Sequence, residues 1–186
     1  ALPDTVTSIG TGAFYNCSSL KTITIPKKVA ELKESTFQYC TALTGVSLPD
    51  GLAVIGPSVF NGCSALTSIN LPDSITTIGT YAFASDALIE VVVPKSVTKM
   101  ENGVFYRNAA LQNAAILGNA SLGSETFYQC SSLQNVQIMG EVSEIPTNTF
   151  ADCKQLKNVT LPKTIRVIGE SAFKNCISLG EIALPD

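Results

Sequence analysis

Short stretches in which polar and hydrophobic residues alternate recur along the whole chain. One of them, residues 22–25, reads Thr-Ile-Thr-Ile. Successive side chains of a strand point to opposite faces, so this alternation predicts a short β-strand with Ile23 and Ile25 facing inward. Pro26 follows directly and has no backbone N–H, and we therefore expect the strand to end there.

These stretches belong to a repeat of 22 or 23 residues, which the phenylalanines mark most clearly. All eight phenylalanines fall in one series with these spacings: Phe14, Phe37, Phe60, Phe83, Phe105, Phe127, Phe150 and Phe173. Each of the six cysteines follows one of them by three residues, and Asp86 and Asn108 take this place in the other two units. Seven of the nine prolines share another phase. Three residue types locked to one period identify an array of eight repeat units.

The rest of each unit contains no second alternating stretch. Val29 and Leu32 are apolar residues three apart, which predicts a turn of the chain. Further along the unit, Ile9, Ala13 and Cys17 are four residues apart, and Phe14 lies beside them. This spacing predicts one or two turns of α- or 3₁₀-helix with the apolar side inward.

A single unit of this length cannot bury its own apolar residues, so the units must stack. Parallel strands in neighbouring units would then lie about 4.8 Å apart, with like side chains forming columns through the interior. We expect residues 1–186 to form one such array. The chain begins with Leu2-Pro3-Asp4 and ends with Leu184-Pro185-Asp186, the same phase of the repeat, without a polar capping unit. We therefore expect a segment of a longer protein with at least one apolar coil end exposed.

Composition argues against several classes of function. The formal net charge is −3 and no basic cluster occurs, which argues against binding to nucleic acid. The chain contains no histidine, the commonest general base and metal ligand. No apolar stretch approaches the roughly 18 residues of a membrane-spanning helix. We see no nucleophile paired with a base, and we expect neither catalysis nor a metal or other cofactor.

The six cysteines are expected to form a buried column of free thiols. They occur as two separated runs of three adjacent units, so pairing neighbours would leave one thiol over in each run. Stacked residues in register also lie about 4.8 Å apart, beyond the Cβ separation of roughly 3.5–4.5 Å that a disulfide prefers. Asp86 and Asn108 at the same position suggest a small side chain that faces backbone polar groups. Burial of Cys17 would disfavour glycosylation of the tripeptide Asn16-Cys17-Ser18, one of three N-x-S/T matches in the chain.

The full repeat resembles the BspA-type leucine-rich repeat. Its pattern, LPxxVTxIGxxAFxxCxxLxxIxLP, is almost fully present over residues 2–26. The resemblance implies a leucine-rich repeat solenoid, a right-handed and mostly β superhelix. Parallel strands would lie on its concave face and short helical turns on its convex side. It also implies a secreted or cell-surface protein that takes part in adhesion.

The strand side chains that point away from the core form the candidate binding surface. The most promising of them are Thr22, Thr24, Ser47, Ser68, Asn70, Glu90, Val92, Asn113, Asn135, Gln137, Asn158 and Thr160, with Gly45, Ala115, Glu181 and Ala183 completing the same register. Hydroxyl and amide groups dominate, and small side chains lose little rotamer entropy when a partner immobilises them. Such a face could bind a protein or a glycan, or it could simply be solvated.

The fourth to sixth units depart from the pattern. Two phenylalanine spacings shorten to 22 residues, and no proline follows Ile116. Ile89, Val92 and Ala115 would form an apolar patch beside Glu90, which suggests contact with another surface. Drift in a tolerant repeat accounts for the same differences.

These features favour a non-catalytic recognition module of a secreted or surface protein. Its partner would be a protein, or a glycan, on a host or bacterial surface. The alternative is a structural spacer that presents another domain and has no ligand of its own.

Overall fold

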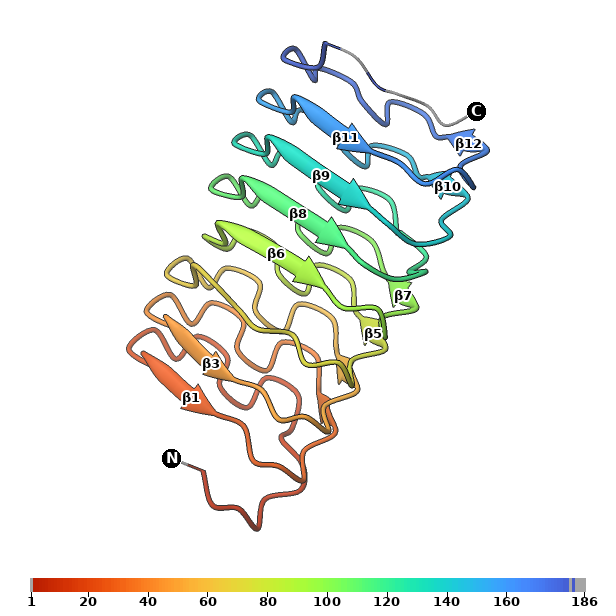
Figure 1. The fold of residues 1–186 in the computed structure, drawn as a ribbon. Coiled ribbons are helices and arrows are strands. Elements are labelled where there is room, and N and C mark those ends of the chain that lie inside the picture. Colours follow the sequence, from red (N-terminus) through yellow and green to blue (C-terminus); the bar gives the residue numbers. More distant parts are fainter. Residues whose placement is uncertain (1, 181, 183–186) are drawn as a thin grey trace.

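The protein is a stack of similar coils that advances steadily from the N-terminus to the C-terminus (Figure 1). The computed structural model describes residues 2–180 and residue 182. We name each coil after its phenylalanine. One side of the stack carries six of the strands, which form the first ladder: β1 (Thr22–Thr24), β3 (Gly45–Ser47), β6 (Glu90–Val93), β8 (Asn113–Ile116), β9 (Asn135–Ile138) and β11 (Asn158–Thr160).

All pairing in the first ladder is parallel and joins equivalent residues of successive coils. Ile23 lies opposite Val46 in the β1–β3 pair. Asn113 lies opposite Glu90 on one side and Asn135 on the other, within a four-stranded sheet of β6, β8, β9 and β11. The predicted leucine-rich repeat solenoid of short parallel strands is therefore confirmed.

A second ladder runs along a neighbouring side of the stack, where the sequence predicted only a turn. Its two-residue strands are β2 (Glu31–Leu32), β4 (Val54–Ile55), β5 (Thr77–Ile78), β7 (Lys99–Met100), β10 (Glu144–Ile145) and β12 (Val167–Ile168). They also pair in parallel with the equivalent residues of the next coil. Two residues are too few to produce a recognisable alternation, so these strands cannot be identified from the sequence pattern.

The turn segments around the phenylalanines are not helical, and the predicted helical turns are wrong. No helix occurs among residues 2–180. Bonds from residue i+3 to residue i are present, such as Cys17 N to Phe14 O at 3.1 Å. However, the residues two before and two after every phenylalanine have positive φ, as in Gly12 and Asn16 at 62° and 55°. A left-handed residue at every fourth position prevents the i→i−4 bonds of an α-helix.

The alternating conformation turns backbone N–H groups toward the next coil instead. Gly12, Phe14 and Asn16 donate to the carbonyls of Glu34, Thr36 and Gln38 at 2.8–3.0 Å. The same three bonds recur at later coils, for example from Phe127 N to Thr149 O at 2.9 Å. Each junction between coils thus has a third set of backbone links, beside the two ladders.

The eight phenylalanines form a single column through the core, as predicted. Successive ring centroids are 5.2–5.6 Å apart, with the ring planes 4–18° from parallel. The six inner rings are fully buried, while Phe14 and Phe173 at the two ends are partly exposed. The column is packed by further columns of Leu, Ile, Val and Cys. Exposed apolar side chains occur in the last two coils, where Val167, Ile168 and Ile177 are 49%, 44% and 80% exposed. The closing Leu184-Pro185-Asp186 lies outside the described residues.

The two shortened units adjoin the two places where the ladders are interrupted. Phe83 and Leu88 are five residues apart, whereas six residues separate this pair in the other coils, as in Phe60 and Leu66. The preceding coil forms no strand over residues 67–71, so the first ladder lacks strand pairing on both sides of this segment. One bond, from Ile89 N to Thr67 O at 3.1 Å, links the segment to the shortened coil.

The second shortened stretch lies between Ile116 and Leu122, which are six residues apart where the other coils have seven. The second ladder stops after the bridge of Lys99 with Ser121 and resumes at β10. Pro146 contributes to this interruption because it has no N–H. At the equivalent position Gly79 N donates to the carbonyl of Ile55 at 2.8 Å.

Candidate binding surface

The strands β6, β8, β9 and β11 lie side by side in one sheet (Figure 1). We call the surface made by their outward side chains the strand face. Along each of these strands, exposed or half-buried residues alternate with buried ones. Two rows cross the strands in register: Glu90, Asn113, Asn135 and Asn158 form the first, and Val92, Ala115, Gln137 and Thr160 the second. The structure therefore brings all the candidate residues from Glu90 to Thr160 together.

The first row contains a hydrogen-bonded ladder of asparagine side chains. Nδ2 of Asn135 donates to Oδ1 of Asn113 at 2.8 Å, and Nδ2 of Asn158 donates to Oδ1 of Asn135 at 2.7 Å. Each Nδ2 carries two hydrogens, so every member keeps an N–H for a ligand. The ladder fixes the side-chain rotamers before any ligand binds, which lowers the entropic cost of recognition.

The N-terminal candidates form a separate and smaller surface. Thr22 and Thr24 are exposed on β1, opposite Gly45 and Ser47 of β3. Ser68 and Asn70 are exposed as predicted, but they lie in the segment without strand structure between β3 and β6. The expectation of a continuous row of strands is therefore wrong at this coil. Glu181 and Ala183 lie outside the described residues.

The interruption leaves a shallow hollow beside the strand face. It has a volume of about 320 Å³ and is lined by residues 68–71 together with Glu90 and Val92. The predicted apolar patch borders it, because Val92 and Ile89 are each 46% exposed and Ala115 is half-buried. Exposed apolar side chains next to a carboxylate and hydroxyl groups are typical of contact surfaces.

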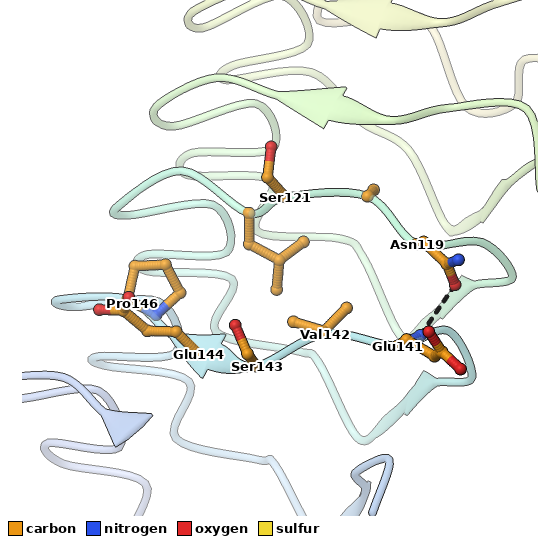
Figure 2. A pocket seen from close by; sticks show the side chains of 9 residues that line it. Asn119, Ser121, Glu141, Val142, Ser143, Glu144 and Pro146 are labelled. Carbon is orange, nitrogen blue, oxygen red and sulfur yellow. Dashed lines mark hydrogen bonds between the residues drawn. The ribbon is translucent and has the colours of Figure 1, made fainter. Parts of the chain in front are cut away.

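A second hollow, which was not predicted, marks the interruption of the second ladder. Figure 2 shows Ser121 on one coil and Val142, Ser143 and Glu144 on the next, with the two backbones apart between them. The volume is about 220 Å³. At one end, the backbone N–H of Glu141 donates to Oδ1 of Asn119 at 2.8 Å and joins the two coils.

The cysteines form the predicted column of free thiols. From Cys40 onward, their Sγ–H groups donate to the phenylalanine carbonyl of the preceding coil, as from Cys63 to Phe37 at 3.2 Å. Burial raises the pKa of Cys130 to about 12, against the lowering effect of a backbone hydrogen bond from Asn108. The buried thiols therefore stay protonated and are poor nucleophiles. The expected burial of Cys17 is wrong: no coil packs over it in the structure, and its side chain is exposed.

The described part of the chain holds no cluster of side chains suited to a metal ion. No three of its Cys, Asp and Glu side chains gather as a metal would require. In the same residues there is no helix long and apolar enough to cross a membrane.

The repeat geometry and the comparison with protein families agree. The family described as BspA-type leucine-rich repeat region matches residues 1–112 and 115–186, in six copies. The chain belongs to this BspA-type family. No curated protein sequence matches it.

Solved structures of leucine-rich repeat proteins are similar to this BspA-type chain over nearly its whole length. One from Bacteroides ovatus has a TM-score of 0.63 and 27% identity, covering 99% of this chain and 66% of that one. The leucine-rich repeat protein of T. pallidum has a TM-score of 0.68 and 29% identity, covering 92% and 70%. A leucine-rich cell surface protein from Faecalibacterium prausnitzii, at 23% identity and a TM-score of 0.52 over 96% and 76%, shares the fold. The BspA-type chain thus spans about two thirds of the length of the first of these relatives.

The turn side of this BspA-type array carries a group of tyrosines that the sequence analysis did not select. Tyr106 and Tyr128 stack with centroids 5.2 Å apart, and Tyr81 meets Tyr106 edge-on at 5.5 Å. The guanidinium of Arg107 lies 5.1 Å from the centre of the Tyr106 ring. The sequence feature that could have indicated this group is a tyrosine directly after the repeat phenylalanine in two successive units.

Proposed function

We propose that this chain is a non-catalytic recognition module of a cell-surface or secreted protein, and that it binds a protein partner through the strand face. The observation that carries the proposal is the pair of rows on β6, β8, β9 and β11. One row presents amide groups held by the asparagine ladder, and the other begins with the exposed Val92.

The chemistry of the surface favours a protein over a glycan as the partner. Val92 and Ile89 give the strand face an apolar area that a partner would remove from water, and the surrounding hydroxyl and amide groups can satisfy backbone polar groups. Glu90 is the one charged residue in the two rows. Surface location is supported by membership of the BspA-type family and by the cell-surface protein of F. prausnitzii that shares this fold.

The test is a binding screen of the purified chain against panels of extracellular matrix proteins and of glycans. A protein ligand should lose about tenfold in affinity on Val92→Glu, which places a charge in the apolar area. Val167→Glu is the matched control, since Val167 is 49% exposed but lies on the second ladder. Equal effects of the two substitutions would exclude the strand face as the binding surface. If no ligand is found in either panel, the result favours a structural spacer. If only glycans bind, the partner is a glycan and not a protein.

A further inference from the structure

The cysteine column has a consistent hydrogen-bond pattern that one residue breaks. Side chains at this position donate to the phenylalanine carbonyl of the preceding coil. Sγ of Cys63 bonds to Phe37 O, Sγ of Cys130 to Phe105 O, and the other thiols from Cys40 onward follow the same rule. Asn108 also obeys it, because its Nδ2 donates to Phe83 O. The position is therefore built for a side-chain donor.

Asp86 occupies the same position with a side chain that, when ionised, can only accept. Its Oδ1 accepts a hydrogen bond from the backbone N–H of Cys63 at 2.8 Å. Its Oδ2 is buried without any hydrogen-bond partner, and the residue as a whole is 6% exposed. In the next coil, Oδ1 of Asn108 is also buried without a partner. Two orphaned acceptors at adjacent positions of one column point to a missing proton.

The surroundings of Asp86 contain no positive charge to hold a carboxylate. The preceding coil presents the Cys63 thiol, whose own pKa is raised by burial. The following coil presents the neutral Asn108. Its neighbour Arg107 is engaged elsewhere, with Nε donating to Gln129 Oε1 at 2.8 Å. Burial raises the pKa of Asp86 well above its ordinary value, although the hydrogen bond from Cys63 N acts in the opposite direction.

We propose that Asp86 is present in the folded array as a neutral carboxylic acid, and that its Oδ2–H is the donor the column requires at this coil. The acceptors that the column offers are the carbonyl of Phe60, equivalent to those the cysteines use, and Oδ1 of Asn108. Ionisation removes this donor and leaves a buried charge at the junction between the Phe60 and Phe83 coils. The first ladder is interrupted at the same junction, so ionisation weakens the array where its strand pairing is already incomplete.

The direct test is the infrared spectrum of the folded protein at neutral pH. The carbonyl stretch of a protonated carboxyl group should be present in the natural chain and absent in Asp86→Asn and Asp86→Cys. Both replacements suit the position, because Asn108 and the six cysteines occupy it in the other coils. If neither variant loses this band, Asp86 is ionised in the folded protein and the proposal is overturned.

Stability against pH provides the second test. A carboxyl whose folded pKa lies above its unfolded value of about 3.9 holds an extra proton in the folded state, so stability falls as pH rises from about 4 to the folded pKa. The unfolding constant of the natural chain relative to Asp86→Asn should therefore rise about tenfold per pH unit across that window. Asp73→Asn, which removes an exposed carboxyl and changes the net charge equally, is the control. A ratio that does not change with pH would overturn the proposal.

Hydrogen exchange locates the effect. The amides of Phe60 and Gly62 donate to Ala82 and Ala84 across the affected junction, both at 2.8 Å. Their protection relative to Asp86→Asn should fall as pH rises, while that of Phe127, which donates to Thr149, should not differ between the two proteins. Uniform behaviour at both places would exclude a local role for Asp86.

Discussion

The turn side and the strand sides of the array respond differently to a change in repeat length. The phenylalanine column and its backbone links continue through every junction from Phe14 to Phe173. The first ladder lacks strand pairing on both sides of residues 67–71, between β3 and β6, and the second ladder lacks it between Ser121 and β10. Each interruption adjoins one of the two shortened coils. The loss of one residue therefore changes the chain only between the strands and the turns, and the spacing between successive phenylalanine rings stays the same.

The interruptions also fall at different junctions. The Phe60 coil lacks strand pairing in the first ladder with both neighbouring coils, but β4, β5 and β7 join these coils in the second ladder. The Phe105 and Phe127 coils lack strand pairing in the second ladder but are joined by β8 and β9 in the first. Since each of these irregular junctions keeps two of its three sets of backbone links, the core column should dominate stability and the irregular positions should contribute less.

The largest effect is therefore expected within the aromatic column. Phe105→Ala removes a fully buried ring that stacks on both sides, and should cost roughly 3–5 kcal/mol of unfolding free energy. Phe14→Ala, at a partly exposed ring with one stacked neighbour, should cost clearly less. Urea unfolding followed by circular dichroism measures both. Equal losses would mean that burial in the column does not set stability.

A smaller effect is expected at the shortened coil. A side chain on Gly140 would collide with the backbone carbonyl of Gly118, so Gly140→Ala should cost roughly 1–3 kcal/mol through overpacking. Gly10→Ala is the matched control because no atom lies within 4 Å of the added carbon. Thermal unfolding of the two variants compares them. A Gly140→Ala protein as stable as the control would show that the two coils can separate there without cost.

The smallest effect is one of reactivity. In the native protein, Cys17 should react promptly with a thiol reagent and the partly buried Cys176 more slowly. The four buried cysteines should react only after unfolding, because burial keeps them protonated as well as inaccessible. Mass spectrometry of labelled peptides distinguishes the sites. Prompt labelling of Cys63 would indicate that the interrupted junction opens readily.

Periodicity was sufficient to predict the architecture, because one strand pattern and one aromatic position recur in every unit. The same register placed the candidate residues from Glu90 to Thr160 on one face, where the structure has them. The residue pattern gave wrong predictions where hydrogen bonds of the backbone determine the local structure. Spacing of four residues at Ile9, Ala13 and Cys17 predicted helix, but the left-handed residues beside Phe14 direct the N–H groups to the next coil.

Side-chain pairing was likewise not predictable from residue type alone. Asparagine at positions 113, 135 and 158 suggested a polar face, whereas the ladder among these amides depends on strand register and rotamers. Ser68 and Asn70 kept the periodic position but lost the strand, since the deletion before Leu88 lies in the following coil. A pattern confined to one unit carries no information about its neighbour's length.

The three sets of links between coils have a mechanical consequence. A protein anchored at one end and bound to a partner at the other carries tension along the axis of the stack. Under such a load the force at the irregular junctions is shared by fewer bonds than at the regular ones, so the array would part there first. The intact coils on either side would remain folded and able to close again.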